Sequence, residues 1–84
     1  MDMQEESAPR MYRIRIHGNL DPRWSEWLAD MSIASERTEA GGPAVVLTGL
    51  LADQAALRGV LNRLWDLNLA VISVNRIDGH REEA

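Results

Sequence analysis

The segment PAVVLTGLLADQAALRGVLNRLWDLNLAVISV, residues 43–74, predicts a strand, a helix and a second strand. Its first part, PAVVLTG (43–49), is apolar and β-branched, as is typical of a central strand. Asp53 suits the N-cap of a helix whose leucines recur at helical spacing, and Asn68 suits the left-handed residue that follows a helix. Residues 70–78 then alternate as a strand. The segment therefore predicts one β-α-β unit.

The preceding part of the chain shows the same pattern. MYRIRIHG (11–18) alternates apolar and polar residues, which predicts a half-buried strand. DPRWSEWLADM (21–31) predicts a helix, with Asp as N-cap and Pro at the first helical position. SIASERTEAGG (32–42) predicts a weaker, charged edge strand before a turn. The helix has one apolar stripe at α-helical spacing, made of Trp24, Trp27, Leu28 and Met31. This stripe predicts that both tryptophans are buried and that Trp27→Ala costs about 3–5 kcal/mol.

The two halves share a corner in which a Gly leaves the sheet, a Leu fills the corner and an Asp caps the helix. Two right-handed crossovers of this kind predict an α+β, ferredoxin-like βαββαβ fold. Its sheet would have four antiparallel strands, with both helices on one face. We expect a single ferredoxin-like domain over residues 11–78, with disordered tails at 1–10 (acidic) and 79–84.

Composition limits the classes of function. The 84 residues carry a formal net charge of −4, contain no cysteine, and show no apolar run long enough to cross a membrane. The N-terminal residues MDMQEESAPR lack the apolar stretch of a secretory signal. We therefore expect a soluble, cytoplasmic protein with no membrane partner. The absence of a broad basic field argues against nucleic acid as a partner.

Two segments resemble a known group of proteins. YRIRIHGNLDPRWSEWL (12–28) and TGLLADQAALRGVLNRLWDLNLAVISV (48–74) are similar to segments of small bacterial proteins of uncharacterised function. Members of that group carry a strand-Gly-x-Leu-Asp-Pro-x-Trp-Ser-x-Trp segment and an Asp-Gln-Ala-Ala-Leu helix. The resemblance covers about residues 11–77. It implies a small α+β fold but no activity, cofactor or catalytic residue.

No catalytic constellation is present in the sequence. Phosphate-binding loops, nucleophile elbows and metalloprotease motifs are all missing. A metal site would have to combine His17 with Asp21 and Asp53, a spacing that matches no common metal motif. Glu26 and Asp30 share one helix face, where a carboxylate pair more often serves solvation than catalysis. We therefore expect a protein that is not an enzyme and that holds no metal and no cofactor.

The sheet face without helices is the candidate interaction surface. Arg13 and Arg15 would pair there with Glu36 and Glu39, or would contact RNA, although the aromatic rings on which bases stack are missing. The strand at 43–49 is apolar on both sides, so part of it must face away from the helices, which indicates a partner. We expect homodimerisation through this face, or binding of a protein partner there. The candidate residues are Arg13, Arg15, His17, Val46, Thr48, Ser73 and Asn75.

Two alternatives remain open at this stage. The first is a sensor of a small anionic metabolite, bound at a dimer interface or at the helix N-termini behind Asp21 and Asp53. The second concerns oligomer geometry, because Ala55 and Gly59 form a strip of small residues on the outer face of the second helix. Trp65 would lie at the rim of the core, where it could also anchor an interface.

Overall fold

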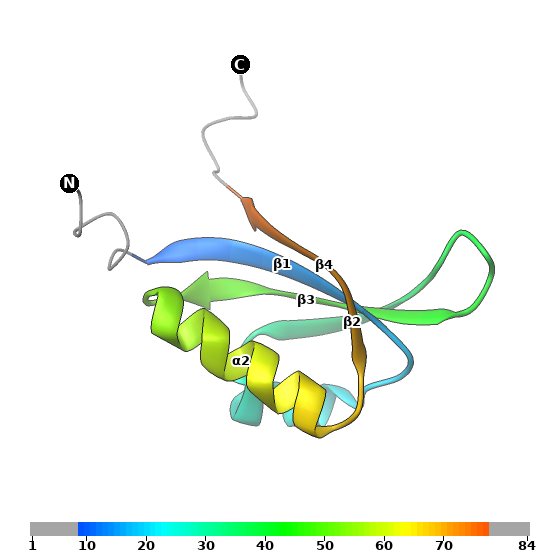
Figure 1. The fold of residues 1–84 in the computed structure, drawn as a ribbon, viewed down its shortest axis with the longest axis horizontal. Coiled ribbons are helices and arrows are strands. Elements are labelled where there is room, and N and C mark those ends of the chain that lie inside the picture. The colour runs from blue at the N-terminus through cyan, green and yellow to red at the C-terminus, as the bar shows by residue number, and fades with distance from the viewer. Residues whose placement is uncertain (1–8, 78–84) are drawn as a thin grey trace, which may run out of the picture.

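The computed structural model describes residues 9–77, which form a four-stranded sheet and two helical segments (Figure 1). The elements are β1 (Arg10–His17), the 3-10 helix η1 (Pro22–Leu28), β2 (Ser32–Arg37), β3 (Pro43–Leu51), the α-helix α2 (Gln54–Asp66) and β4 (Ala70–Ile77). The strands lie in the order β2-β3-β1-β4, and every neighbouring pair is antiparallel. The predicted α+β class with a four-stranded antiparallel sheet is confirmed.

The predicted tails lie almost entirely outside the described residues. Only Pro9 and Arg10 of the N-terminal tail are described, and Arg10 is already the first residue of β1. The C-terminal tail, and Asp78 at the predicted end of the domain, lie outside the described residues.

The first helical segment differs from the prediction, because it is a seven-residue 3-10 helix. Asp21 caps its start, as predicted. Two successive residues in the left-handed region, Ala29 and Asp30 (both at φ 59°), end it. The Ser25 hydroxyl then donates a hydrogen bond of 2.7 Å to the carbonyl of Met31, which fixes the exit from the helix. The predicted βαββαβ order with two α-helices is therefore not met, since only α2 is an α-helix among the described residues.

The tryptophans of η1 lie at the surface, which corrects the prediction that they belong to the core. A 3-10 helix has about 3.0 residues per turn, so residues three apart stand directly above one another. Trp24 and Trp27 therefore lie on one side of η1, with ring centroids 5.2 Å apart, ring planes tilted by 57° and 38% of each residue exposed. Leu28 points in another direction and is fully buried. The predicted stripe was wrong because it assumed α-helical spacing.

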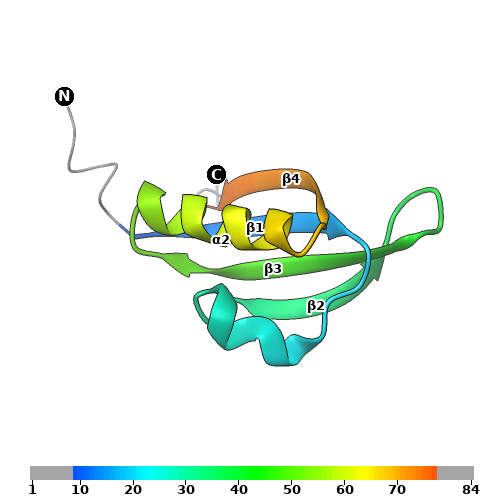
Figure 2. The ribbon, with the colours of Figure 1, turned by 60° about the horizontal axis from the view of Figure 1, so that its bottom comes forward.

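The core is one aliphatic layer between the sheet and the two helical segments. Ile14 and Ile16 of β1 lie directly opposite Leu47 and Val45 of β3, and none of the four is exposed. η1 and α2 cover the same sheet face, η1 over β2 and α2 over the β1 and β4 side (Figure 2). The buried cluster comprises Tyr12, Ile14, Ile16, Leu20, Leu28, Met31, Val45, Leu47, Leu51, Val60 and Leu64.

Gly49 permits the closest approach between the sheet and the segment that follows η1. A Cβ at Gly49 would lie 3.0 Å from Cγ and 3.1 Å from Cα of Met31, closer than side chains pack. The sequence predicted that the chain leaves the sheet at Gly49, but β3 continues to Leu51. The missing Cβ instead makes room for Met31. Gly18, at φ 114°, does follow the end of β1, as predicted.

The termini of α2 follow the sequence prediction. Asp53 caps the start by accepting a hydrogen bond of 2.8 Å from the backbone N–H of Ala56. Asn68 adopts the left-handed conformation at φ 66°, and the N–H of Leu69 donates to the carbonyl of Leu64 at 3.1 Å. This six-residue closure is a Schellman ending, and the left-handed residue in it is Asn68, as the sequence predicted.

β4 contains an irregularity that the alternating pattern did not reveal. Val74 pairs with Ile14, but the register shifts so that Ser73 pairs with Arg15 and Val71 with Ile16. Ile72 is the extra residue, and such a bulge redirects its side chain. The alternation predicted for residues 70–78 would place Ile72 and Val74 on one face. Instead, Ile72 lies with Arg15 on the opposite side of the sheet from Val74.

The burial pattern predicts that two side chains of η1, Leu28 and Trp24, contribute very differently to stability. Leu28→Ala should lower the free energy of unfolding by about 2–5 kcal/mol, because it opens a cavity in the core. Trp24→Ala should lower it by less than Leu28→Ala does, because Trp24 is already 38% exposed and its removal opens no internal cavity. Urea unfolding at one fixed protein concentration measures both. A loss for Trp24→Ala equal to that for Leu28→Ala would contradict the exposed placement.

Candidate functional site

The sheet face that carries no helix, called the open face below, is the candidate functional site. Its residues alternate along each strand with the core residues, and the register aligns them in rows across the sheet. One row contains Thr48, Arg13 and Asn75, and the next contains Val46, Arg15 and Ser73. His17 follows in the row beyond, opposite Ala44. All seven residues that the sequence proposed for this surface therefore lie on one face of the sheet.

The two arginines of the open face differ in their surroundings. Arg15 forms an ion pair with Glu36 of β2, with 3.2 Å between Nε and Oε1, across the intervening strand β3. The sequence predicted this pairing. Arg13 is exposed and forms no ion pair with another described residue, so its predicted pairing with acids of β2 is absent from that part of the chain. Arg13 therefore presents its guanidinium on this face with no acidic partner among the described residues.

An apolar row at one end of the open face was missed by sequence reasoning. Leu50, Met11 and Ile77 lie side by side across β3, β1 and β4. Leu50 is 60% exposed and Met11 is 38% exposed. The row was missed because the third strand was predicted to end at Gly49, one residue too early to include Leu50. The sequence did carry one signal for Leu50, because the alternation of the third strand continues past Gly49.

A hollow of about 430 Å³ opens at the other end of the open face. Its lining joins Arg15 and His17 of β1 with the turn between β2 and β3 and with the bulged Ile72 of β4. The turn contributes Thr38, Glu39 and Ala40. The hollow thus combines one cation, one imidazole and one hydroxyl with a carboxylate, and Arg15 is already paired with Glu36.

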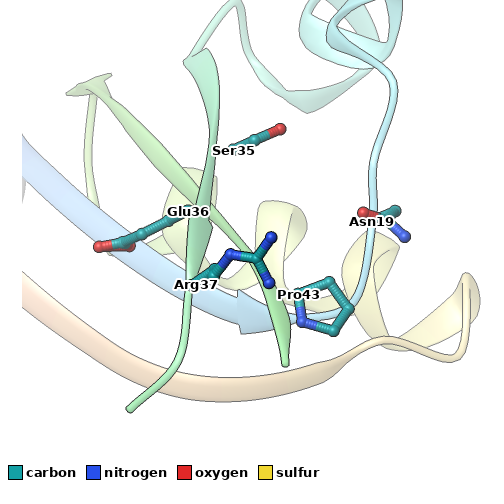
Figure 3. Close-up of a pocket in the computed structure, with 5 residues that line it drawn as sticks. All are labelled: Asn19, Ser35, Glu36, Arg37 and Pro43. Carbon is teal, nitrogen blue, oxygen red and sulfur yellow. The ribbon is translucent and has the colours of Figure 1, made fainter. Parts of the chain in front are cut away.

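A second hollow, of about 420 Å³, lies at the end of β2 and is lined by Asn19, Ser35, Glu36, Arg37 and Pro43. Figure 3 shows Glu36 and Arg37 pointing in opposite directions, with Arg37 directed towards Pro43. Arg37 donates a hydrogen bond of 3.1 Å to the carbonyl of Gly41, so its guanidinium serves the β2–β3 turn. We therefore assign this hollow a role in turn structure rather than in binding.

The helix N-termini are occupied by their own caps. The Asp21 carboxylate accepts two hydrogen bonds from Arg23, one from the backbone N–H at 3.0 Å and one from the side-chain Nε at 3.3 Å. The backbone hydrogen bond is the main cause that lowers the pKa of Asp21 below 3.8. Asp53 caps α2 in the same way. Each terminus thus presents a carboxylate, which does not favour an anionic ligand there.

Within residues 9–77, no group of three or more His, Cys, Asp or Glu side chains could hold a metal ion, so His17, Asp21 and Asp53 do not form a site. His80 lies outside the described residues. No helix in the described part of the chain is long and apolar enough to cross a membrane.

These features define a small α+β domain with one helix-covered and one open sheet face. Residues 11–75 match the family model described as a domain of unknown function, DUF8691, and the chain belongs to this family. The predicted relation to small uncharacterised proteins is thus supported at the level of the family. No curated protein matches the chain, and no solved structure matches it.

The cap at Asp21 generates a pH prediction. A lowered pKa in the folded state means that the Asp21 carboxylate stabilises the fold above pH 3.8 and that this contribution is lost as the pH falls through the folded-state pKa. Asp21→Asn should therefore unfold at lower urea than wild type at neutral pH, and the difference should shrink below pH 3.8. Urea midpoints measured across this range test the prediction. A difference that does not change with pH would contradict it.

Proposed function

We propose that this protein is a non-enzymatic interaction module that self-associates through its open face. The observation that carries the proposal is the exposed apolar row of Leu50, Met11 and Ile77 on a face that no helix covers. Val46 and the bulged Ile72 add aliphatic surface further along the same face, beyond the polar row of Thr48, Arg13 and Asn75. An exposed row of large apolar side chains rimmed by polar residues is typical of interaction sites.

A second copy fits this surface better than an unrelated ligand does. Sheets pack face to face at about 10 Å, and a two-fold axis brings the same patch of each copy together. The long side chains of Arg13 and Arg15 can lay their aliphatic stems over the contact while their charged ends stay near its rim. Arg13, which has no acidic partner among the described residues, is available to a carboxylate of the second copy.

We also propose that the fold is a ferredoxin-like variant in which the first α-helix is reduced to a 3-10 helix. Support comes from the order of the elements along the chain and from the antiparallel neighbours in the sheet. Both helical segments pack on one face, as in the split β-α-β arrangement. The proposal concerns architecture only, because a fold of this kind hosts many functions.

Sedimentation of wild type and one open-face variant tests the function. Wild type should sediment as a dimer or a larger species at micromolar concentration. Leu50→Arg should reduce the association state by half, because it places a charge in the centre of an apolar contact. Leu50 is largely exposed in the single chain, so this change should leave the fold intact.

The matched control is Ala55→Arg, which adds the same charge at an exposed position of α2, on the side of the sheet opposite the open face. It should sediment like wild type. A wild-type protein that remains monomeric at high micromolar concentration would contradict self-association. A Leu50→Arg protein with wild-type sedimentation would contradict the use of the open face.

A second candidate function is favoured by the hollow lined by Arg15, His17 and Thr38. We propose that, if the protein senses a small anionic metabolite, the ligand binds in this hollow, which a dimer formed through the open face would cover. The capped helix N-termini do not support the alternative position. Nucleic acid is disfavoured, because among the paired strand residues His17 is the one ring that the open face presents.

Thermal-shift measurements with carboxylate and phosphate metabolites test this second candidate. A ligand present at 100 times its Kd should raise the stability by about 2.7 kcal/mol. The shift should disappear in Arg15→Ala and should persist in Arg37→Ala, which removes the arginine of the other hollow. Shifts that persist in Arg15→Ala would place the ligand elsewhere, and no shift with any anion would contradict the sensor.

A further inference from the structure

β4 is an outer strand of the sheet, and its composition suits pairing with another strand. No described strand lies on its outer side, and its eight residues include one charged side chain, Arg76. The other outer strand, β2, has six residues, two of which, Glu36 and Arg37, are charged. Charge and short length are the features that protect sheet edges from pairing with other chains. By these criteria β2 is protected and β4 is not.

An apolar flank of α2 lies on the same side of the molecule as the β4 edge. Arg63 places its guanidinium 5.5 Å from the ring centre of Trp27, so one flank of α2 faces η1. Leu57, Leu61 and Trp65 lie on the opposite flank, away from η1, because they project roughly 120–200° from Arg63 around the helix. Trp65 is 53% exposed, and these residues line a hollow of about 380 Å³.

The β4 edge also exposes apolar surface towards this flank. Val74 pairs with the buried Ile14, so its side chain is on the helix side of the sheet, yet it is 38% exposed because β4 is the outermost strand. α2 packs against β4. The outer side of β4 and the outer flank of α2 therefore form one surface, called the edge surface below.

One two-fold axis can relate both β4 and α2 of the edge surface to the same elements of a second copy. α2 and β4 are joined by a tight turn at Leu67 and Asn68. Leu61 lies about 9 Å along the helix from this turn, at 1.5 Å per residue. Ser73 lies about 10 Å along the strand from Ala70, the first residue of β4, at about 3.3 Å per residue. An axis perpendicular to the sheet near Ser73 therefore passes the helix near Leu61.

We infer that the edge surface binds a second copy of this chain, with β4 paired antiparallel to β4 and α2 packed antiparallel to α2. The two sheets join into one of eight strands. The Arg76 side chains of the two copies lie at opposite ends of the seam, so like charges do not meet. Arg58 of one helix comes opposite Trp65 of the other, the same pairing of residue types that Arg63 and Trp27 make within the chain.

This contact does not depend on the open face, which remains on the other side of the joined sheet. The axis of the edge contact is perpendicular to the sheet, and the axis of a face-to-face contact lies parallel to it. If the two axes intersect, they generate a closed tetramer of two eight-stranded sheets. Only the tetramer rests on the proposed function; the edge dimer stands by itself.

Sedimentation of interface variants tests the inference. Trp65→Ala and Val74→Lys should each halve the association state of wild type at equal concentration. Trp24→Ala is the matched control, since it removes an exposed tryptophan from η1, and it should leave the association state unchanged. Trp65→Ala combined with Leu50→Arg should be a monomer. Circular dichroism should show that each variant retains the wild-type fold.

Amide hydrogen exchange gives an independent readout. In wild type, amides of residues 70–77 that point away from β1 should gain protection as protein concentration rises, and amides of β2 should not. Edge variants with wild-type sedimentation, or no gain of protection in β4, would overturn the inference.

If Leu50→Arg alone gives a monomer, the edge contact is wrong and the open face is right. If Leu50→Arg changes nothing while Trp65→Ala gives a monomer, the reverse holds.

Discussion

The whole structure depends on the fact that its helical segments cover only one face of the sheet. A four-stranded sheet has two faces, and this chain provides one α-helix of 13 residues and one 3-10 helix of seven among its described residues. Both pack on the same face, where they bury a single aliphatic layer against β1 and β3. The other face keeps the side chains that the strand alternation directs to it. In a small domain, such a face must be polar enough for water or must be covered by another chain.

The helix-covered side reaches its packing through local backbone conformations. Gly49 lets the backbone of Met31 approach β3, and the left-handed Ala29 and Asp30 bring Met31 to that position. A longer α-helix in place of η1 would carry the chain past this point before it could turn into β2. The chain turns into β2 soon after the short 3-10 helix, and the placing of Trp24 and Trp27 on one side of η1 follows from the 3-10 spacing. Their position beside Arg63 connects η1 to α2 across the surface.

Much of the candidate site could be predicted from alternation alone. The seven residues proposed for the open face share it because each strand alternates its side chains and antiparallel neighbours keep rows in register. Two residues of the open face were not predicted from alternation. Leu50 joins the face because β3 runs past Gly49. Ile72 joins it because a bulge shifts β4 by one residue against β1, and a single sequence carries no sign of that shift.

The sequence by itself determined the α+β class, the caps at Asp21 and Asp53, the left-handed ending at Asn68 and the identity of most strand residues. These features depend on side-chain chemistry within a few residues of each other, which a linear pattern records. Only the tertiary structure decided that η1 is a 3-10 helix, that Trp24 and Trp27 are exposed and that β4 is bulged. Those outcomes depend on contacts between residues distant in sequence, such as Met31 against Gly49 and β4 against β1, and local propensity does not encode them.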